Sequence, residues 1–253
     1  MKIFVTNLKD SVDRRRFMDM QFAKQNLDVE YVDCVIGADL DMATLKAECD
    51  LTSIDKQNEK VKWFTKGIIG CTMTNQNTYK RIVSENIPYA LLLEDDIVLP
   101  PKLNSLILEI EGFIQPRDVI LLFWKSSEVL KLKLNTKIEL NKDVWVMNPS
   151  NTEALSGGSA FIVTKSAAER MIASNTPIKI TPDSWHYFYK NECIDRLFIT
   201  KPDVFKSAVL QSTMDIGKFK KLRTILNKIP VIKDILRYRR NSSYFNSQRI
   251  EII

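Results

Sequence analysis

Long apolar runs are missing from this sequence of 253 residues: none approaches the roughly 18 consecutive apolar residues that a membrane-spanning helix needs. The opening residues 1–8 become polar before the apolar core of a secretory signal can form, so we expect no leader. Repeats and low-complexity tracts are also absent. What remains is an ordinary globular balance, 45% hydrophobic and 27% charged. It predicts one large α/β domain, or one domain with an appendage.

Histidine and cysteine are scarce. Histidine occurs once, at position 186, and the cysteines are scattered with no CxxC pair, at Cys34, Cys49, Cys71 and Cys193. Scattered thiols in a chain without a leader indicate a reducing compartment, where their expected role is that of small core residues. The sequence therefore predicts a cytoplasmic location.

Acidic residues are nearly missing from one segment, and the basic character of the chain is concentrated there. Of a formal net charge of +6, the segment Gly217–Arg240 carries +8, from nine Lys or Arg and the single acid Asp234, so the rest of the chain carries −2. Apolar residues are interleaved with these bases on both sides of Pro230, at helical spacing in the first part. A basic amphipathic helix pair of this kind is typical of proteins that bind anionic membrane surfaces.

The alternative interpretation of this segment is a helix packed on the main domain with a solvated basic face. Nucleic-acid binding is disfavoured, because no other part of the sequence carries a nucleic-acid motif. We therefore expect chemistry in the body of the chain, residues 1–213, and attachment to a membrane through the segment 214–253, with no nucleic acid as a partner.

The body alternates apolar runs with segments of helical spacing. One helix is expected at Val12–Gln25, with a possible cap at Ser11 and apolar positions at Phe17, Met20 and Phe22. Further helices are expected at Ile68–Asn86, Leu103–Phe113 and Lys165–Ser174, short helices and loops at Asp39–Lys60, and strands at Lys2–Leu8, Val29–Val35, Tyr89–Leu93, Val119–Trp124, Val144–Met147 and Ser159–Val163. This order predicts an α/β sandwich with a mixed, largely parallel sheet.

The most informative feature is a fully apolar run that ends in three acids. Tyr89–Leu93 suits the middle of a sheet, and Glu94, Asp95 and Asp96 follow it directly. In extended backbone Glu94 and Asp96 point to the side opposite Asp95, at the strand end where open α/β sheets bind ligands. Adjacent carboxylates repel one another unless a cation or hydrogen-bond donors lie among them. Carboxylate oxygens suit Mg²⁺ or Mn²⁺, ions that usually keep positions open for substrate phosphates. The same acidic cluster is also compatible with a solvated acidic turn, or with a phosphatase or a nuclease.

Five blocks of the sequence resemble known motifs in the same order: Ile3–Leu8 with Asp13-Arg14-Arg15, Gly70–Asn75, Ile87–Asp96, Gly157–Ala168, and Pro182-Asp183. They are similar to the blocks of the family-25 glycosyltransferases, the lipooligosaccharide galactosyltransferase group. The block Ile87–Asp96, IPYALLLEDD, resembles that family's "iPyalilEDD" block most closely. The resemblance covers roughly residues 1–210 and leaves out Gly217–Arg240. Asn75 departs from the pattern, since the family has His there.

The resemblance implies a GT-A-like, Rossmann-type αβα sandwich over residues 1–213, with the basic helical segment 214–253 appended. It implies a UDP-sugar donor, with UDP-galactose as the first candidate, and transfer with inversion to a lipooligosaccharide or related glycan acceptor. The protein would be peripheral on the inner face of the bacterial inner membrane. The departure at Asn75 motivates the alternative of a non-catalytic nucleotide- or glycan-binding homologue. A metal-dependent phosphohydrolase is the third interpretation of the acidic cluster.

A departing UDP needs positive charge where its negative charge develops. A cation, Mn²⁺ or Mg²⁺, held by Glu94 and Asp96 with Asp95 assisting, would supply it. Arg14 and Arg15 follow the first strand and are suited to grip a diphosphate, or else belong to a solvated helix start. Asn7 is predicted to contact uracil or ribose. The backbone amides of Gly157 and Gly158 are predicted to approach a phosphate or sugar closely, and all three positions also suit turns.

An inverting transfer also needs a general base, on the side of the sugar opposite the diphosphate. That side must come from the second half of the chain. Asp183 is the first candidate, because it matches the Pro-Asp block and follows a loop fixed by proline. His186 is the second candidate and Glu153 the third. A loop-capping role for Asp183 and a packed or surface position for His186 are the alternatives.

Overall fold

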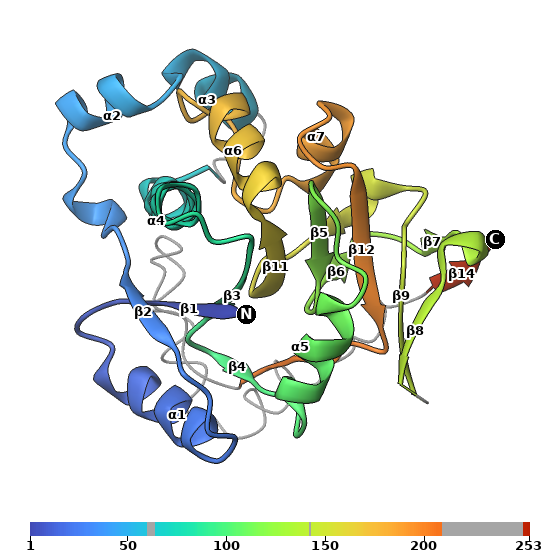
Figure 1. Ribbon diagram of the computed structural model, residues 1–253. Helices are drawn as coiled ribbons and strands as arrows, with labels where there is room; N and C mark the ends of the chain where they lie inside the picture. Colours follow the sequence, from blue (N-terminus) through green and yellow to red (C-terminus); the bar gives the residue numbers. More distant parts are fainter. Residues whose placement is uncertain (60–63, 142, 209–249) are drawn as a thin grey trace, which may run out of the picture.

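The computed structural model describes residues 1–59, 64–141, 143–208 and 250–253 (Figure 1). Among these residues, no helix has the length and apolar character needed to cross a membrane. The basic segment Gly217–Arg240 and the predicted division after residue 213 lie outside the described residues. The membrane-binding helices expected there therefore stay a prediction.

Eight strands form the central sheet: β1 Lys2–Asn7, β2 Glu30–Asp33, β3 Tyr89–Glu94, β5 Asp118–Leu121, β8 Ile138–Asn141, β9 Val144–Met147, β11 Ala160–Thr164 and β12 Arg196–Lys201. Their order is β2-β1-β3-β11-β5-β12-β9-β8 (Figure 1). Parallel pairs join β2 to β1, β1 to β3 and β5 to β12, whereas β11 and β9 pair antiparallel with both neighbours. Six of the eight strands thus run in one direction, and the predicted mixed, largely parallel sheet is confirmed.

The apolar run before the acids lies in the middle of this sheet, as predicted. Ala90 to Leu93 in β3 are at most 2% exposed, because strands flank them and helices cover both faces. Leu92 is in register with Phe4 of β1 and Phe161 of β11. Each buried leucine contributes about 1.5–3 kcal/mol relative to an exposed one, which fixes the strand and therefore the position of the acids at its end.

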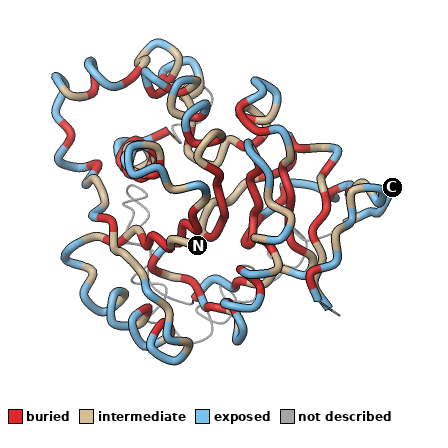
Figure 2. The backbone as a smooth tube through the Cα atoms, viewed as in Figure 1, coloured by how far each residue is buried: buried red, intermediate tan, exposed pale blue. Residues whose placement is uncertain are grey.

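Helices cover both faces of the sheet and complete an αβα sandwich (Figure 1). They are α1 Val12–Ala23, α4 Lys66–Ser84, α5 Leu103–Glu111, α6 Lys165–Ser174 and α7 Trp185–Lys190. Side chains of α4, α6 and α7 pack with Phe4 and Leu92 in one buried cluster, and side chains of α1 and α5 pack with Ile3 and Leu91 in the other. Figure 2 shows the longest buried stretches in the strands between these two layers. The predicted αβα arrangement is therefore confirmed.

The predicted short helices after β2 are also present, as η1 Gly37–Asp39, α2 Met42–Glu48 and α3 Leu51–Asn58. Asp41 caps α2 by accepting from the Thr44 amide, and Asp50 caps α3 by accepting from the Ser53 amide. A third apolar cluster joins these helices to the start of α4, with Leu45, Ile54, Ile69 and Ile178 among its members.

The apolar positions expected in α1 are confirmed only in part: Phe22 is buried and Phe17 packs against the same cluster, but Met20 does not. Met18 and Phe22, which lie four residues apart, are buried against the sheet, whereas Met20 is 53% exposed. Residues four apart share one face of a helix, so the pair at 18 and 22 sets the phase and Met20 falls on the outer side. Ser11 occupies the N-cap position as expected, but its side chain makes no capping hydrogen bond.

The start of α4 touches the loop after β2 backbone against backbone. A Cβ atom on Gly70 would lie 2.6 Å from the Val35 carbonyl oxygen and 2.9 Å from the Gly37 nitrogen, and one on Gly37 would overlap the backbone of Lys66. The Val35 amide also donates to Thr74 Oγ1 at 2.9 Å. Glycine at these two positions lets α4 sit directly against the carboxyl edge of β2.

We expect Gly70→Ala to lower the free energy of unfolding by about 1–3 kcal/mol, because the added methyl group overlaps backbone atoms that cannot turn aside. Gly67→Ala is the matched control in the same helix, since a Cβ there would meet only Thr65 Oγ1, at 3.6 Å. Alanine at 67 should be neutral or stabilising by up to about 1 kcal/mol. Urea unfolding measures the free energy of unfolding of both variants. A Gly70→Ala protein as stable as the Gly67→Ala control would contradict the close contact.

Three two-stranded sheets border the large one, and the sequence did not predict them. They pair β4 Ile97–Val98 with β13 Lys206–Ser207, β6 Lys125–Ser126 with β10 Leu155–Ser156, and β7 Leu130–Leu132 with β14 Ile250–Ile252. Two 3₁₀ turns, η2 Leu134–Thr136 and η3 Thr152–Ala154, lie between these strands. After β13, the Ala208 amide donates to the Asp96 carbonyl at 2.7 Å, so residue 208 lies beside the acidic cluster. The parallel pairing of β14 with β7 places residues 250–252 against the body of the protein.

Candidate active site

Two cavities adjoin at the edge of the sheet where β1, β2 and β3 end. The larger, of about 400 Å³, lies between these strand ends and the start of α4; Thr6, Gly37, Lys66 and Asp96 are among the residues around it. The smaller, of about 280 Å³, lies between α4, the start of β11 and the loop Thr181–Asp183. Both are lined by Cys71, Asn75 and Glu94. The two cavities are therefore neighbouring parts of one cleft.

Asp95 is the buried member of the acidic cluster. One carboxylate oxygen accepts from Asn7 Nδ2 at 2.7 Å and the other from Arg14 Nη1 at 2.5 Å. Arg14 also pairs with Asp96, with Nη2 and Oδ2 3.1 Å apart. The carboxylate of Asp95 thus ties the end of β3 to the end of β1 and to α1. This network holds all three acids at the larger cavity, which Glu94, Asp95 and Asp96 all line. The predicted placement of Asp95 opposite Asp96 is not seen, because β3 ends at Glu94 and the turn after it brings both carboxylates to Arg14.

Glu94 and Asp96 carry charge that the protein only partly neutralises. Glu94 faces both cavities and accepts from Ser159 Oγ at 2.7 Å. Its pKa is raised to about 7, mainly because the protein atoms around it limit its solvation and also because of the charges of Asp96, Asp183 and Asp95, while the Ser159 hydrogen bond acts in the opposite direction. Burial also raises the pKa of Asp96, although Arg14 acts in the opposite direction. A cation between these carboxylates would favour their charged forms.

The donor set limits how a metal ion could be held. Among residues 1–59, 64–141, 143–208 and 250–253, no group of three or more His, Cys, Asp or Glu side chains is gathered as a metal site. Glu94 and Asp96 nevertheless both line the larger cavity. Mg²⁺ is commonly bound through one or two carboxylates, with phosphates and water completing its coordination. The residues present fit that type of site and do not form a closed protein cage.

The other predicted nucleotide contacts differ in their placement. Arg14 lines the larger cavity with its guanidinium against Asp95 and Asp96. Arg15 lines neither cavity, and its guanidinium carbon lies 4.1 Å from the centre of the Tyr31 ring. Asn7 is buried behind Asp95 and is also absent from both linings. Of these three predicted contacts, the structure places one, Arg14, at the cleft.

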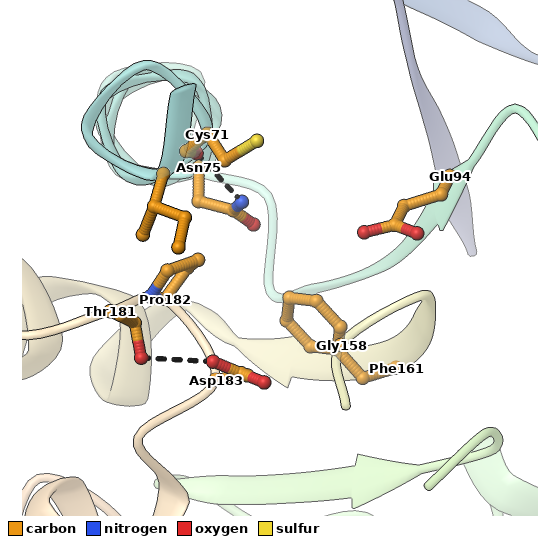
Figure 3. A pocket seen from close by; sticks show the side chains of 9 residues that line it. Cys71, Asn75, Glu94, Gly158, Phe161, Thr181, Pro182 and Asp183 are labelled. Atoms are coloured by element: carbon orange, nitrogen blue, oxygen red, sulfur yellow. Dashed lines mark hydrogen bonds between the residues drawn. The ribbon is translucent and has the colours of Figure 1, made fainter. Parts of the chain in front are cut away.

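Asp183 lies on the smaller cavity, with Glu94 on another wall of the same space (Figure 3). Its two carboxylate oxygens accept one hydrogen bond each, from the Gly157 amide at 3.0 Å and from Thr181 Oγ1 at 2.9 Å. The Gly157 carbonyl in turn accepts from Trp185 Nε1 at 2.8 Å. This arrangement fixes the carboxylate while leaving further acceptor positions on both oxygens.

The predicted glycines lie beside Asp183. Gly157 has a φ of 90°, a conformation that side chains disfavour, and its amide points at the carboxylate of Asp183. Gly158 lines the smaller cavity, and a Cβ atom there would lie 3.6 Å from the Asp183 Cβ. Both glycines therefore lie beside Asp183, and Gly158 lines the smaller cavity whereas Gly157 does not.

The second and third candidates for the general base lie outside the cleft. His186 Nδ1 is 2.8 Å from Thr152 Oγ1 and 3.9 Å from Glu153 Oε2. The side chains of His186 and Glu153 are 45% and 60% exposed, and neither lines either of the two cavities of the cleft. Trp185 explains this, because its indole is fully buried and the next residue of the helix must point in another direction.

The start of α4 and the loop after β2 supply lining residues that sequence reasoning did not place at the site. They include Cys34, Gly37, Lys66, Cys71 and Thr74. Lys66 Nζ donates to the Leu40 carbonyl at 2.5 Å, so its ammonium bridges α4 and the segment before α2. The block Gly70–Asn75 was the available signal, since Gly70 sets the approach of α4 and both Cys71 and Asn75 face the cleft.

Comparison with known proteins points to one family. The model of glycosyltransferase family 25 (LPS biosynthesis protein) matches residues 1–186. Procollagen galactosyltransferase 2 of Homo sapiens is 21% identical over 182 residues, which are 72% of this chain and 29% of that protein. A lipooligosaccharide biosynthesis protein of Haemophilus influenzae is 22% identical over 181 residues, which are 67% of this chain and 62% of that protein. The chain thus spans less than two thirds of each of these two relatives.

Among solved structures, a glycosyltransferase involved in the glycosylation of the major capsid of PBCV-1 aligns with a TM-score of 0.38 and 10% identity, over 83% of this chain and 93% of that chain.

Proposed function

The chain belongs to glycosyltransferase family 25, and from this premise we propose that it is an inverting hexosyltransferase that uses a UDP-sugar, with galactose as the first candidate. The proposed acceptor is a lipooligosaccharide or a related glycan. The observation that carries the proposal is that Glu94 and Asp183 line one cleft from the ends of different strands and loops. The relatives named for galactosyl transfer and for lipooligosaccharide biosynthesis support this choice of sugar and acceptor.

On the donor side, we place the nucleotide in the larger cavity. Glu94 and Asp96 would hold Mn²⁺ or Mg²⁺ there; when bound, such an ion neutralises charge that develops on the departing diphosphate. Asp95 keeps these two carboxylates in place through its bonds to Asn7 and Arg14. Arg14 adds a fixed positive charge to the same wall.

On the acceptor side, we assign Asp183 as the general base. The acceptor hydroxyl oxygen forms a bond to the anomeric carbon as the bond from that carbon to the UDP oxygen breaks, and Asp183 takes the hydroxyl proton. The bonds from Gly157 and Thr181 orient the carboxylate for this role, because each oxygen keeps a position for a further hydrogen. The fixed orientation avoids reorganisation as the proton moves.

A panel of UDP-sugars tests this proposal. We expect one UDP-hexose to bind with Mn²⁺ in calorimetry and to release UDP only when a glycan acceptor is present. Phosphate release from simple phosphate esters without an acceptor would support a metal-dependent phosphohydrolase instead. Binding without turnover on any acceptor of an acceptor panel would support a non-catalytic nucleotide- or glycan-binding homologue.

We also propose that the protein works at the inner face of the bacterial inner membrane, attached through Gly217–Arg240. Each base near an anionic surface contributes about 1 kcal/mol of attraction. The protein should therefore bind phosphatidylglycerol-containing liposomes at low salt and dissociate as salt is added. Alanine at Lys218, Lys220, Lys221 and Arg223 should weaken this binding strongly. If the wild type and the variant with four alanines sediment with the liposomes to the same extent, attachment through this segment is contradicted.

A further inference from the structure

Asn75 occupies the junction of the two cavities. It is one of three residues that line both of them, together with Cys71 and Glu94. With the nucleotide in the larger cavity and the acceptor in the smaller one, the transferred hexose must lie where the cavities meet. The side chain of Asn75 is therefore placed beside the hexose and away from the uridine.

The orientation of the Asn75 amide is fixed by one hydrogen bond. Its Nδ2 donates to the Cys71 carbonyl, one turn earlier in α4, at 3.0 Å. A carbonyl oxygen can only accept, so the NH₂ group must face Cys71 and the amide oxygen must face away from it. Figure 3 shows this side chain reaching from α4 into the cavity, on the side where Glu94 and Asp183 also lie. Within the described part of the chain, no group donates to that oxygen.

From this geometry we propose that Asn75 is a specificity-determining residue, whose amide oxygen accepts a hydrogen bond from one hydroxyl of the transferred hexose. The inference rests on the proposed function. Sugars that differ only in one hydroxyl can be separated strongly by a polar group that requires the hydroxyl, because its absence leaves that group unpaired. Asn75 is suited to this task, since its amide is held by α4 before the sugar binds.

Donors that lack one hydroxyl at a time give the sharpest test. In the wild type, one deoxy form of the preferred UDP-hexose should lose about 10–100-fold in kcat/KM. Asn75→Leu should lose a similar factor with the parent sugar, yet treat the parent and that deoxy donor alike within about twofold. Asn75→Ala is the second variant, in which a water molecule can enter the vacated space and restore part of the activity.

Asn77→Ala is the matched control, because Asn77 lies in the same helix, is exposed and lines neither cavity. The affinity for UDP alone should stay within about twofold of wild type in all three variants, since the amide faces the hexose. If Asn75→Leu lost the same factor in kcat/KM with every donor, so that its preference among donors matched that of the wild type, the assignment of Asn75 would be overturned. A wild type that uses no UDP-sugar would instead refute the proposed function, so the two failures are distinguishable.

Discussion

Replacing Asp183 with Asn is expected to lower kcat for sugar transfer by about 10²–10⁴-fold, the range that general-base catalysis contributes. The amide can still accept from Gly157 or Thr181, so the loop should keep its position, but it cannot take a proton from the acceptor. The affinity for UDP should change by less than about twofold, because Asp183 lies on the smaller cavity and not on the larger one. Steady-state kinetics with calorimetry of UDP binding measures both quantities.

Glu153→Gln and His186→Gln are the controls for this prediction, since both residues lie outside the cleft. Each should keep kcat within about twofold of wild type. A large loss in either control, with Asp183→Asn nearly as active as wild type, would show that the base had been assigned to the wrong side chain.

The second large effect is expected at the end of β3. Asp96→Asn should weaken Mn²⁺-dependent UDP binding by tenfold or more, because it removes the charge from one of the two proposed metal ligands. Loss of even an outer partner of a metal ligand commonly lowers metal affinity by about 10–100-fold. Binding of UDP without added metal should change less. Titrations with and without a chelator separate the two contributions.

Asp33→Asn is the matched control, because Asp33 is an exposed carboxylate at the end of β2, on the far side of β1 from β3, and lines neither cavity. The stability of both variants should be measured by urea unfolding, because Asp96 also pairs with Arg14 and its replacement can lower the free energy of unfolding. If a folded Asp96→Asn protein and the Asp33→Asn control show the same metal-dependent affinity, Asp96 does not hold the ion.

The position of the acidic strand end was predictable, because an apolar run of five residues suits a central strand and open α/β sheets bind ligands at the ends of such strands. The finer prediction, that side-chain alternation separates Asp95 from Glu94 and Asp96, does not hold, because the strand ends at Glu94. Asp95 bonds to Asn7 and Arg14, yet it lines the larger cavity together with Glu94 and Asp96. The position of Asp183 was predicted from its block, since a Pro-Asp pair constrains the backbone of the loop.

Neighbours in sequence were predicted less well, because helical backbone points adjacent side chains in different directions. Arg14 reaches the acids, whereas Arg15 stacks on Tyr31. The buried indole of Trp185 directs the helix so that His186 meets Thr152 on the outer side. Pattern alone fixes the phase of a helix poorly when its apolar residues are few, as the exposed Met20 of α1 also shows.

The walls formed by α4 could not be placed from sequence for a different reason. Cys71 and Asn75 reach the cleft because Gly70 allows α4 to touch the loop after β2, a contact between segments more than thirty positions apart along the chain. The block Gly70–Asn75 indicated that the residues matter. Which residues lie beside Cys71 and Asn75 is set by the folded structure, because these residues come from distant segments of the chain.

The most direct measurement is the manganese anomalous signal from a crystal grown with Mn²⁺ and UDP. We expect a peak coordinated by Glu94 or Asp96 and by the diphosphate, with the uridine in the cavity between the ends of β1, β2 and β3 and the start of α4. A peak at another part of the protein, or a uridine bound beside Asp183, would contradict this expectation.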